Sequence, residues 1–256
     1  MSRAAVVVNH RFDVDQAMSV LDRSASEAGV ELVDADAEAD LVVALGGDGT
    51  MLGSLRARLG TGTPVFGFNF GRMGFLTSAQ GSELETVIPR VFAGDFRVAE
   101  LATLAAEIGG SPERAVNDVV VTSGRLGRMA ELRWEVGGEH LGDQQCDGMI
   151  CATPAGSTAY NLSNGGPVMM WGIDAMAISF VAPHSIDVRP VVVPRGYEVR
   201  VENVTRGGSA AVLVDGREQA DLEPGESITL GLGEDKSLLA HLPEVSFFTR
   251  YHDVFS

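Results

Sequence analysis

The feature that most restricts the fold is a short glycine-rich turn between an apolar strand and a helix. The run Leu41–Leu45 is apolar, Gly46-Gly47-Asp48-Gly49-Thr50 (the GGDGT loop) follows it directly, and Met51–Leu59 has helical composition. Glycines let the backbone approach an anion where a Cβ would block it, and the N–H groups at a helix N-terminus attract negative charge. The pattern therefore predicts a strand–turn–helix unit suited to holding phosphate.

Strands and helices alternate through the first part of the chain. Apolar strands are expected at Ala4–Asn9, Leu41–Leu45 and Pro64–Phe68, and helices at Asp13–Ala28, Met51–Leu59 and Glu83–Phe92. Asp13 or Asp15 is the expected N-cap of the first helix, and Gly60 is the expected stop of the second. This alternation is typical of an α/β domain with a parallel sheet.

After about Gly94 the pattern changes to short β-rich runs separated by glycine, proline and asparagine or aspartate turns. The runs are Leu101–Ile108, Ala115–Thr122, Ala130–Val136, Met149–Ala152, Ala175–Val181, Glu198–Val204, Ala210–Val214 and Ser227–Leu232. Only the stretch after Gly156 has helical character. We therefore expect an α/β plus β fold, with an N-terminal α/β domain at residues 1–95 and a β-sandwich-like domain at 96–256. The tail after about residue 243 is expected to return to the first domain.

The charge of the chain limits its partners. The formal net charge is −16, which repels nucleic-acid phosphates and anionic membrane surfaces. No apolar run approaches the roughly 20 residues that span a bilayer, and polar residues interrupt the N-terminus before a secretory core forms. We expect a cytoplasmic protein that binds neither nucleic acid nor membrane. Its single lysine, Lys236, lies far from every glycine-rich motif, which excludes a P-loop.

Cysteine and histidine positions give no sign of a structural metal site. Cys146 and Cys151 lie beside an apolar run without neighbouring ligands at zinc spacing, and the five histidines are scattered. We expect both cysteines to be buried as small hydrophobic side chains.

Asp48 is the unusual member of the GGDGT loop, because a carboxylate among phosphate-binding amides would repel its ligand. It fits there if it binds a cation, or if it takes a proton from an attacking hydroxyl, as phosphoryl transfer to an alcohol requires. The alternative is structural: Asp48 forms an Asx-turn or helix cap, and the glycines serve only a tight turn.

A second glycine-rich segment, Asp147–Pro167, again leads from a strand into small residues and then a helix. The small residues Ala155, Gly156 and Ala159 would leave room for a flat base. Ser157 or Thr158 would cap the helix. Tyr160 and Ser163 would share one face of the helix. The segment favours a nucleoside pocket. The alternative is a capped helix packed closely on a strand.

A polar pair, Asn117-Asp118, interrupts the apolar run Ala115–Val121. Burying a carboxamide and a carboxylate is costly unless both find partners, and ribose hydroxyls are suitable ones. A turn at the edge of a strand is the alternative interpretation.

Taken in order, these segments resemble the NAD kinase family. The resemblance is carried by the GGDGT loop, Asn117-Asp118 and Thr153–Pro167, and it continues in Phe66–Leu76, Ala182–Pro190 and Val214-Asp215-Gly216. It covers about Leu41 to Asp221. Diacylglycerol kinases, sphingosine kinases and phosphofructokinases share related GGDGT loops, whereas the long second motif belongs with NAD kinases.

The resemblance implies transfer of the γ-phosphate of ATP to the 2′-hydroxyl of the adenosine ribose of NAD, giving NADP, with Mg²⁺ or another divalent cation. Asp48 matches the general base proposed for the family. Positions matching those that hold the nucleotides are Gly46, Gly47, Gly49, Thr50, Asn117, Asp118, Asp147, Thr158, Ala159, Tyr160, Asn161, Leu162 and Ser163. The resemblance also implies a homodimer or homotetramer.

Four positions depart from the family pattern or fit it only loosely. Gln145 stands where many bacterial members carry arginine, Arg217 where some carry glutamine, and Asp118 where many carry the longer glutamate. Arg128 aligns with a contact position, with a solvated surface arginine as the alternative. The substitutions at Gln145 and Arg217 concern how the far end of the dinucleotide is held, not the reaction.

Two other functions compete with NAD phosphorylation. A lipid kinase of the diacylglycerol type would use the same loop, but it needs an apolar or basic membrane-facing surface, and the charge of −16 argues against that. A nucleotide-sensing protein would keep the pocket without the chemistry, and the presence of Asp48 argues against that.

Overall fold

The computed structural model describes residues 1–12, 14–71, 74–125 and 127–255. The chain divides into two compact units, of which the first comprises Met1–Glu100 with Ser237–Ser256 and the second Leu101–Lys236. Residues thus return to the first unit from position 237, whereas the sequence predicted a return after about 243. Asp13, Arg72 and Met73, used in the sequence interpretation, lie outside the described residues. Within those ranges, no helix has the length and apolar character needed to cross a membrane.

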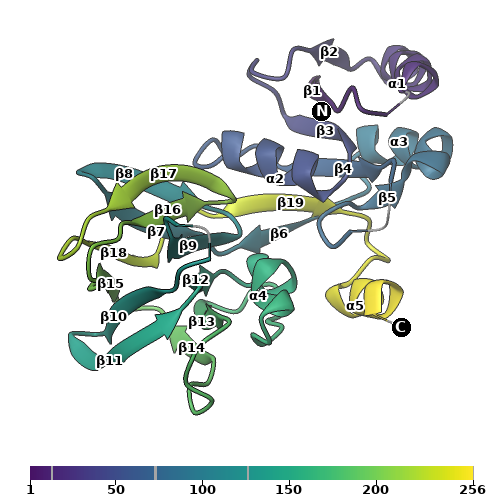
Figure 1. The fold of residues 1–256 in the computed structure, drawn as a ribbon. Helices are drawn as coiled ribbons and strands as arrows, with labels where there is room; N and C mark the ends of the chain where they lie inside the picture. Colours follow the sequence, from purple (N-terminus) through teal and green to yellow (C-terminus); the bar gives the residue numbers. More distant parts are fainter. Residues whose placement is uncertain (13, 72–73, 126, 256) are drawn as a thin grey trace. The chain divides into compact units, whose positions relative to one another are not determined.

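The first unit is built on a parallel sheet with helices, as predicted. Its strands follow the order β2-β1-β3-β4-β19-β6, with β5 beside β4 (Figure 1). Their bounds are Arg3–Val8 for β1, Glu31–Val33 for β2, Leu41–Gly46 for β3, Val65–Asn69 for β4, Ala79–Gln80 for β5, Arg97–Leu101 for β6 and Ser237–His241 for β19. The pairs β1–β2, β1–β3, β3–β4, β4–β5 and β4–β19 are parallel.

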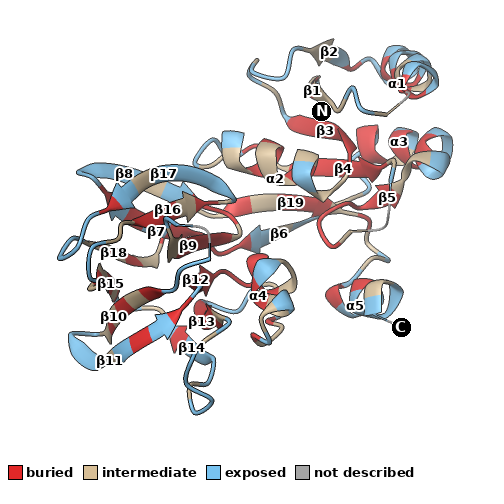
Figure 2. Cartoon of the chain, viewed as in Figure 1, coloured by how far each residue is buried: buried red, intermediate tan, exposed pale blue. Residues whose placement is uncertain are grey.

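Helices complete the core of this unit. They are α1 (Asp15–Ala28), α2 (Asp48–Ala57), α3 (Leu84–Phe92), preceded by a 3₁₀ turn at Gly81–Glu83, and α5 (Phe247–Phe255). The central strands β3 and β4 are buried along their whole length (Figure 2). Phe66 and Phe68 of β4 pack with Leu21 of α1 and Ile88 of α3 in one core cluster. This core fixes the end of β3, where the GGDGT loop begins.

Two details at helix ends differ from the prediction. Asp15 is the first residue of α1, and Val14 occupies the N-cap position without a side-chain hydrogen bond, so Asp15 is not the cap. Helix α2 ends at Ala57 with Arg58 as its C-cap. Gly60 lies beyond that end with a left-handed φ of 74°, so it belongs to the following turn.

The second unit is an antiparallel β-sandwich, as predicted. One sheet has the order β11-β10-β15-β18-β7-β8 and the other β14-β13-β12-β9-β16-β17 (Figure 1). The bounds are Leu104–Ile108 for β7, Ser111–Ala115 for β8, Asp118–Ser123 for β9, Ala130–Val136 for β10, Glu139–Cys146 for β11, Gly148–Ala152 for β12, Ala175–Val181 for β13, Val191–Pro194 for β14, Val199–Asn203 for β15, Ala210–Val214 for β16, Arg217–Leu222 for β17 and Ser227–Leu232 for β18. A 3₁₀ turn at Gly156–Thr158 and α4 at Tyr160–Ser163 follow β12.

Apolar side chains from both sheets form the core of the sandwich. Leu132 of one sheet shares a cluster with Met149 and Val212 of the other. Cys146 and Cys151 are buried thiols in the same cluster, as predicted, and burial raises the pKa of each to about 12. Both therefore act as small core residues.

The sequence prediction failed where strands are polar or change sheet. β11 and β17 lie at sheet edges and are largely exposed, so neither contains an apolar run. The expected strand Ala115–Thr122 is broken at Val116-Asn117, because β8 belongs to one sheet and β9 to the other. The expected strand Leu101–Ile108 begins only at Leu104, since Leu101 ends β6.

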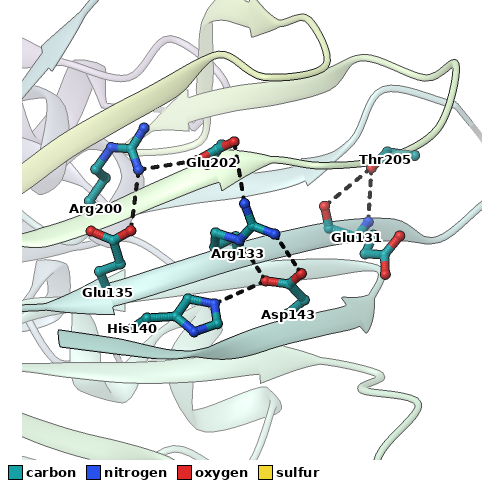
Figure 3. Close-up of polar contacts among 8 residues, drawn as sticks. All are labelled: Glu131, Arg133, Glu135, His140, Asp143, Arg200, Glu202 and Thr205. Atoms are coloured by element: carbon teal, nitrogen blue, oxygen red, sulfur yellow. Dashed lines mark hydrogen bonds and ion pairs between the residues drawn. The ribbon is translucent and has the colours of Figure 1, made fainter.

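An ion-pair network occupies the solvated face of β10, β11 and β15 (Figure 3). Arg133 donates to both carboxylate oxygens of Asp143 at 2.9 Å, and Arg200 contacts Glu135 and Glu202 at 3.3 and 3.1 Å. The network side chains alternate along β10 with buried ones, as a strand with one solvated face requires. It contains no predicted site residue, and we regard it as part of the sandwich surface.

Candidate functional site

The GGDGT loop joins Gly46, the last residue of β3, to Asp48, the first residue of α2. Gly47 is the N-cap of α2, and it caps the helix without a side-chain hydrogen bond. A Cβ on Gly46 would overlap the side chain of Thr50, so this position requires glycine. Gly49 is exposed, and a Cβ built on it would meet open space. The N-terminal end of α2 is therefore accessible at Gly49, where helix geometry favours an anion.

Asp48 does not cap its own helix, because its carboxylate binds another loop. Oδ2 accepts a hydrogen bond from the backbone N–H of Phe75 at 2.7 Å, and Oδ1 accepts one from Leu76 at 3.0 Å. A Cβ on Gly74 would overlap this carboxylate, so glycine is required there too. The alternative of an Asx-turn or helix cap is therefore wrong. The Phe66–Leu76 motif contains these residues, but its sequence does not signal the contact.

Two asparagines at strand ends lie beside the GGDGT loop, and the sequence interpretation gave neither of them a role. Asn9 follows β1, and its Nδ2 donates to Oγ1 of Thr50 at 3.2 Å. Asn69 ends β4 and is 1% exposed, and its Oδ1 accepts a hydrogen bond from the N–H of Gly71 at 3.1 Å. The carboxyl ends of parallel strands are where open α/β sheets bind ligands. Asn9 is the last residue of one predicted strand and Asn69 directly follows another, and this position is the signal that would have identified them.

In the second unit, Asn117 packs directly against the turn that follows β12. The N–H of Thr153 donates to the carbonyl oxygen of Asn117 at 2.8 Å, and Thr153 Oγ1 donates to that of Val116 at 2.6 Å. Thr153 Oγ1 also accepts a hydrogen bond from the N–H of Gly156 at 3.0 Å. A Cβ on Gly156 would overlap the Asn117 carbonyl group. The structure thus brings Asn117-Asp118 together with the start of the Thr153–Pro167 motif.

The hydroxyl groups expected to cap the helix of this motif have other partners. Ser157 is fully buried, and its Oγ donates to the carbonyl of Pro154 at 2.7 Å and accepts from the N–H of Met169 at 2.9 Å. Thr158 Oγ1 donates to a carbonyl three residues back, at 3.2 Å. Ala159 is the N-cap of α4, so the cap prediction for Ser157 or Thr158 is wrong.

Asn161 is the most enclosed of the predicted residues in α4. It is fully buried, and its Nδ2 donates to the carbonyls of Ser157 and Pro167 at 3.1 Å each. Its Oδ1 and that of Asn117 are buried without a hydrogen-bond partner in the described part of the chain. Such oxygens are costly unless a ligand donates to them. Of the other members, Thr158, Ala159 and Leu162 are half-buried, and Tyr160 and Ser163 are exposed.

Asp215 holds the Asn117-Asp118 pair from the turn between β16 and β17. Its carboxylate accepts hydrogen bonds from the backbone N–H groups of Val116, Asn117 and Asp118 at 3.1, 2.7 and 3.3 Å. Asp118 is 6% exposed, and burial with the nearby charge of Asp215 raises its pKa from 3.8 to about 7. Arg217 lies exposed at the start of β17. The sequence predicted Asp215 only as part of a motif, and it did not predict that this carboxylate would hold Asn117-Asp118.

The remaining predicted residues, Asp147, Gln145 and Arg128, lie just before β12 or just after β9 in the chain, and we call them the Asp147 group. Asp147 precedes β12, and its carbonyl oxygen accepts a hydrogen bond from Thr122 Oγ1 at 2.7 Å, near the last residue of β9. Asp118 is the first residue of β9, so the length of the strand separates the two groups by roughly 13 Å. Gln145 on β11 and Arg128 in the loop after β9 are exposed members of the Asp147 group.

Family models for the two halves of one class of enzyme match this chain. The ATP-NAD kinase N-terminal domain matches residues 9–96, and the ATP-NAD kinase C-terminal domain matches residues 116–242. The GGDGT loop lies in the first match and both groups of the second unit lie in the second. The fold and the site therefore define a kinase.

Relatives identify the family. NAD kinases from Heliobacterium modesticaldum and Gemmatimonas aurantiaca are 38% and 37% identical to this chain over 223 and 222 residues. These alignments cover 85% and 84% of this chain and 79% and 76% of the relatives. The chain belongs to the NAD kinase family.

Solved structures agree with this assignment at the level of the fold. Yeast NADH kinase complexed with NADH matches with a TM-score of 0.84 and 20% identity, covering 99% of this chain and 87% of that one. An NAD kinase from Archaeoglobus fulgidus in complex with ATP matches with a TM-score of 0.81 and 26% identity, covering 99% and 97%.

Proposed function

We propose that this protein converts NAD to NADP by transferring the γ-phosphate of ATP to the 2′-hydroxyl of the adenosine ribose, with Asp48 as general base. The observation that carries the proposal is the setting of Asp48, a carboxylate at the start of α2 held by two backbone N–H groups in a glycine-rich turn. A carboxylate oxygen that accepts one hydrogen bond keeps a further lone pair, which is able to accept a proton from a hydroxyl.

The surroundings of each predicted residue support nucleotide binding. The accessible N-terminal end of α2 at Gly49 suits the phosphates of ATP. In the second unit, the unpaired Oδ1 atoms of Asn117 and Asn161 suit a ligand that donates hydrogen bonds, such as a ribose or an adenine. The separation of roughly 13 Å along β9 between the Asp118 and Asp147 groups suits an extended dinucleotide better than a single nucleoside.

Mg²⁺ fits the proposed reaction as a companion of ATP. It usually keeps several waters and takes one or two carboxylates together with substrate phosphates. Among the described residues, no group of three or more His, Cys, Asp or Glu side chains is arranged to hold a metal, so the phosphates would be its main ligands. Bound there, it would neutralise charge on the transferred phosphoryl group. Dependence on Mg²⁺ and assembly into a homodimer or homotetramer stay predictions.

The substitution Asp48→Asn tests the role of the base. It keeps the size of the side chain and removes its basicity, so we expect kcat to fall by roughly 10²- to 10⁴-fold with NAD affinity changed by less than about threefold. The assay contains ATP, Mg²⁺ and NAD, and NADP is followed with a dehydrogenase that requires it. NAD affinity is measured separately by calorimetry.

Asp40→Asn is the matched control for this test. Asp40 also accepts backbone hydrogen bonds, from Ser2 and Arg3 at 2.6 and 3.0 Å, and lies outside the GGDGT loop. We expect it to retain the wild-type rate. A wild-type rate in Asp48→Asn would remove the general-base assignment. If the unmodified protein bound NAD without product, a sensor would replace the proposed kinase, and activity on diacylglycerol alone would favour a lipid kinase.

A further inference from the structure

Arg250 of α5 is buried in the first unit and binds the same loop as Asp48. It is 4% exposed. Its Nη1 donates to the backbone carbonyl oxygens of Phe75, at 3.1 Å, and of Thr77, and its Nη2 donates to Oγ of Ser78 at 3.3 Å. Burial lowers the pKa of the guanidinium to about 10, and the negative charge of Asp48 opposes that change. The arginine and the aspartate thus interact through charge as well as through the loop.

One peptide unit connects the two side chains. The carbonyl oxygen of Phe75 accepts a hydrogen bond from Arg250, and the N–H of Leu76, in the same planar peptide, donates to Oδ1 of Asp48. Because this peptide is rigid, fixing its oxygen also fixes the direction of its N–H group. Arg250 therefore controls the orientation of a donor that holds the proposed base.

Attachment of α5 does not by itself explain a buried arginine. The ring of Phe75 packs against Phe247 and Phe255 of α5, with centroids 5.5 and 5.6 Å apart. These aromatic contacts dock the helix, and a buried charge costs free energy that an apolar side chain in its place would not. A guanidinium offers a planar set of donors in fixed directions, which suits it to hold several carbonyl groups in one geometry.

We propose that Arg250 is a positioning residue for Asp48 and acts through the Phe75–Leu76 peptide. The inference rests on the proposed function, in which Asp48 is the general base. It adds a residue from α5, outside both family-model matches, to the apparatus that sets the rate.

A double-variant cycle separates positioning from a general structural role. We expect Arg250→Met to lower kcat by roughly 10- to 100-fold with the KM for NAD changed by less than about threefold, because the base is displaced while the second unit is untouched. Arg250→Lys should lose less, since an ammonium still donates to one carbonyl. In the Asp48→Asn background, Arg250→Met should change kcat by less than about twofold, because no base remains to position. Losses that multiply in the double variant would overturn the proposal.

Amide hydrogen exchange measured by NMR provides a readout that does not depend on activity. We expect the N–H groups of Phe75 and Leu76 to lose protection in Arg250→Met and to keep part of it in Arg250→Lys. Protection unchanged from wild type in both variants would overturn the proposal. If Arg250→Met does not fold, Arg250→Lys carries the cycle and the exchange experiment.

Arg90→Met is the matched control. Arg90 contacts Glu244, just before α5, at 2.7 Å and Asp95 at 2.7 Å. It thus joins the same C-terminal segment to the unit without binding residues 74–78. We expect wild-type kcat and wild-type protection of both amides. If Asp48→Asn itself retained the wild-type rate, the general base would be refuted, and the exchange experiment would still decide whether Arg250 fixes the Asp48 contact.

Discussion

Asp48 and Asp215 use the same contact in the two units. Each follows a strand and accepts hydrogen bonds from backbone N–H groups of a distant segment, Asp48 from residues 75 and 76 and Asp215 from residues 116–118. The charged groups nearest to the two carboxylates have opposite signs. A buried arginine, Arg250, lies on the far side of the segment that Asp48 binds, whereas Asp215 lies beside a second carboxylate, Asp118.

The difference shows that a carboxylate–amide contact does not define a role by itself. Near Asp48 the neighbouring charge is positive, because the guanidinium of Arg250 binds the other side of the loop that holds the Asp48 carboxylate. Near Asp215 the neighbouring carboxylate, Asp118, is driven towards its protonated form by burial and by repulsion. The surroundings of Asp48 fit a general base. Asp215 fits a structural clamp that holds residues 116–118, and Asp118 beside it is a residue whose protonation changes with pH.

Removing the clamp tests the second half of the comparison most strongly. Asp215→Ala leaves three backbone N–H groups without their acceptor, so we expect the free energy of unfolding to fall by about 2–4 kcal/mol, measured by urea denaturation. Asp215→Asn keeps one acceptor oxygen and should lose less than half of that. A loss below about 0.5 kcal/mol in Asp215→Ala would show that water replaces the carboxylate without cost.

Displacing Asp48 without changing its chemistry tests the first half. In Gly74→Ala the new methyl group would overlap the Asp48 carboxylate, so we expect kcat to fall by about 100-fold while the KM for NAD stays within about threefold. Gly231→Ala on β18 is the control, because its nearest atom, the carbonyl oxygen of Tyr197, lies at an ordinary 3.6 Å. Equal rates in the two variants would mean that the position of Asp48 does not limit catalysis.

The smallest expected effect concerns the carboxylate pair and pH. The pKa of Asp118 is about 7 in the folded protein against an ordinary 3.8, so the folded state keeps a proton that the unfolded chain releases. The contribution of protonated Asp118 to the free energy of unfolding is therefore complete below about pH 4 and is lost as the pH rises from about 4 through 7. Asp118→Asn cannot titrate, so its stability relative to wild type should increase by about 1–2 kcal/mol between pH 6 and 8.

Urea unfolding at pH 5, 6, 7 and 8 measures this change for the wild type and Asp118→Asn. Asp215→Asn sharpens the test, because removing its charge lowers the pKa of Asp118 and moves the sensitive range to lower pH. A stability difference between wild type and Asp118→Asn that stays constant across this range would mean that Asp118 is ionised throughout.

The sequence predicted what depends on local spacing. The apolar run before Gly46 and the glycines after it fixed the strand–loop–helix unit, and the change of pattern near Gly94 anticipated the sandwich. It did not predict that Asp48 would bind residues 75 and 76, or that Arg250 would bind the same loop. These contacts join positions at least 27 and at least 172 residues apart, and no periodic signal marks them. The raised pKa of Asp118 was equally hidden, since it depends on burial and on Asp215.

Strand β19 lies inside the sheet of the first unit, between β4 and β6, although it comes from residues 237–241. A ribosome therefore releases the complete second unit, residues 101–236, before it releases this strand. Domains generally fold as units during synthesis, so the sandwich is able to fold first. The sheet of the first unit cannot be completed until β19 has been synthesised. Arg250 emerges later still, so the contact proposed to position Asp48 forms only after the chain of the second unit has left the ribosome.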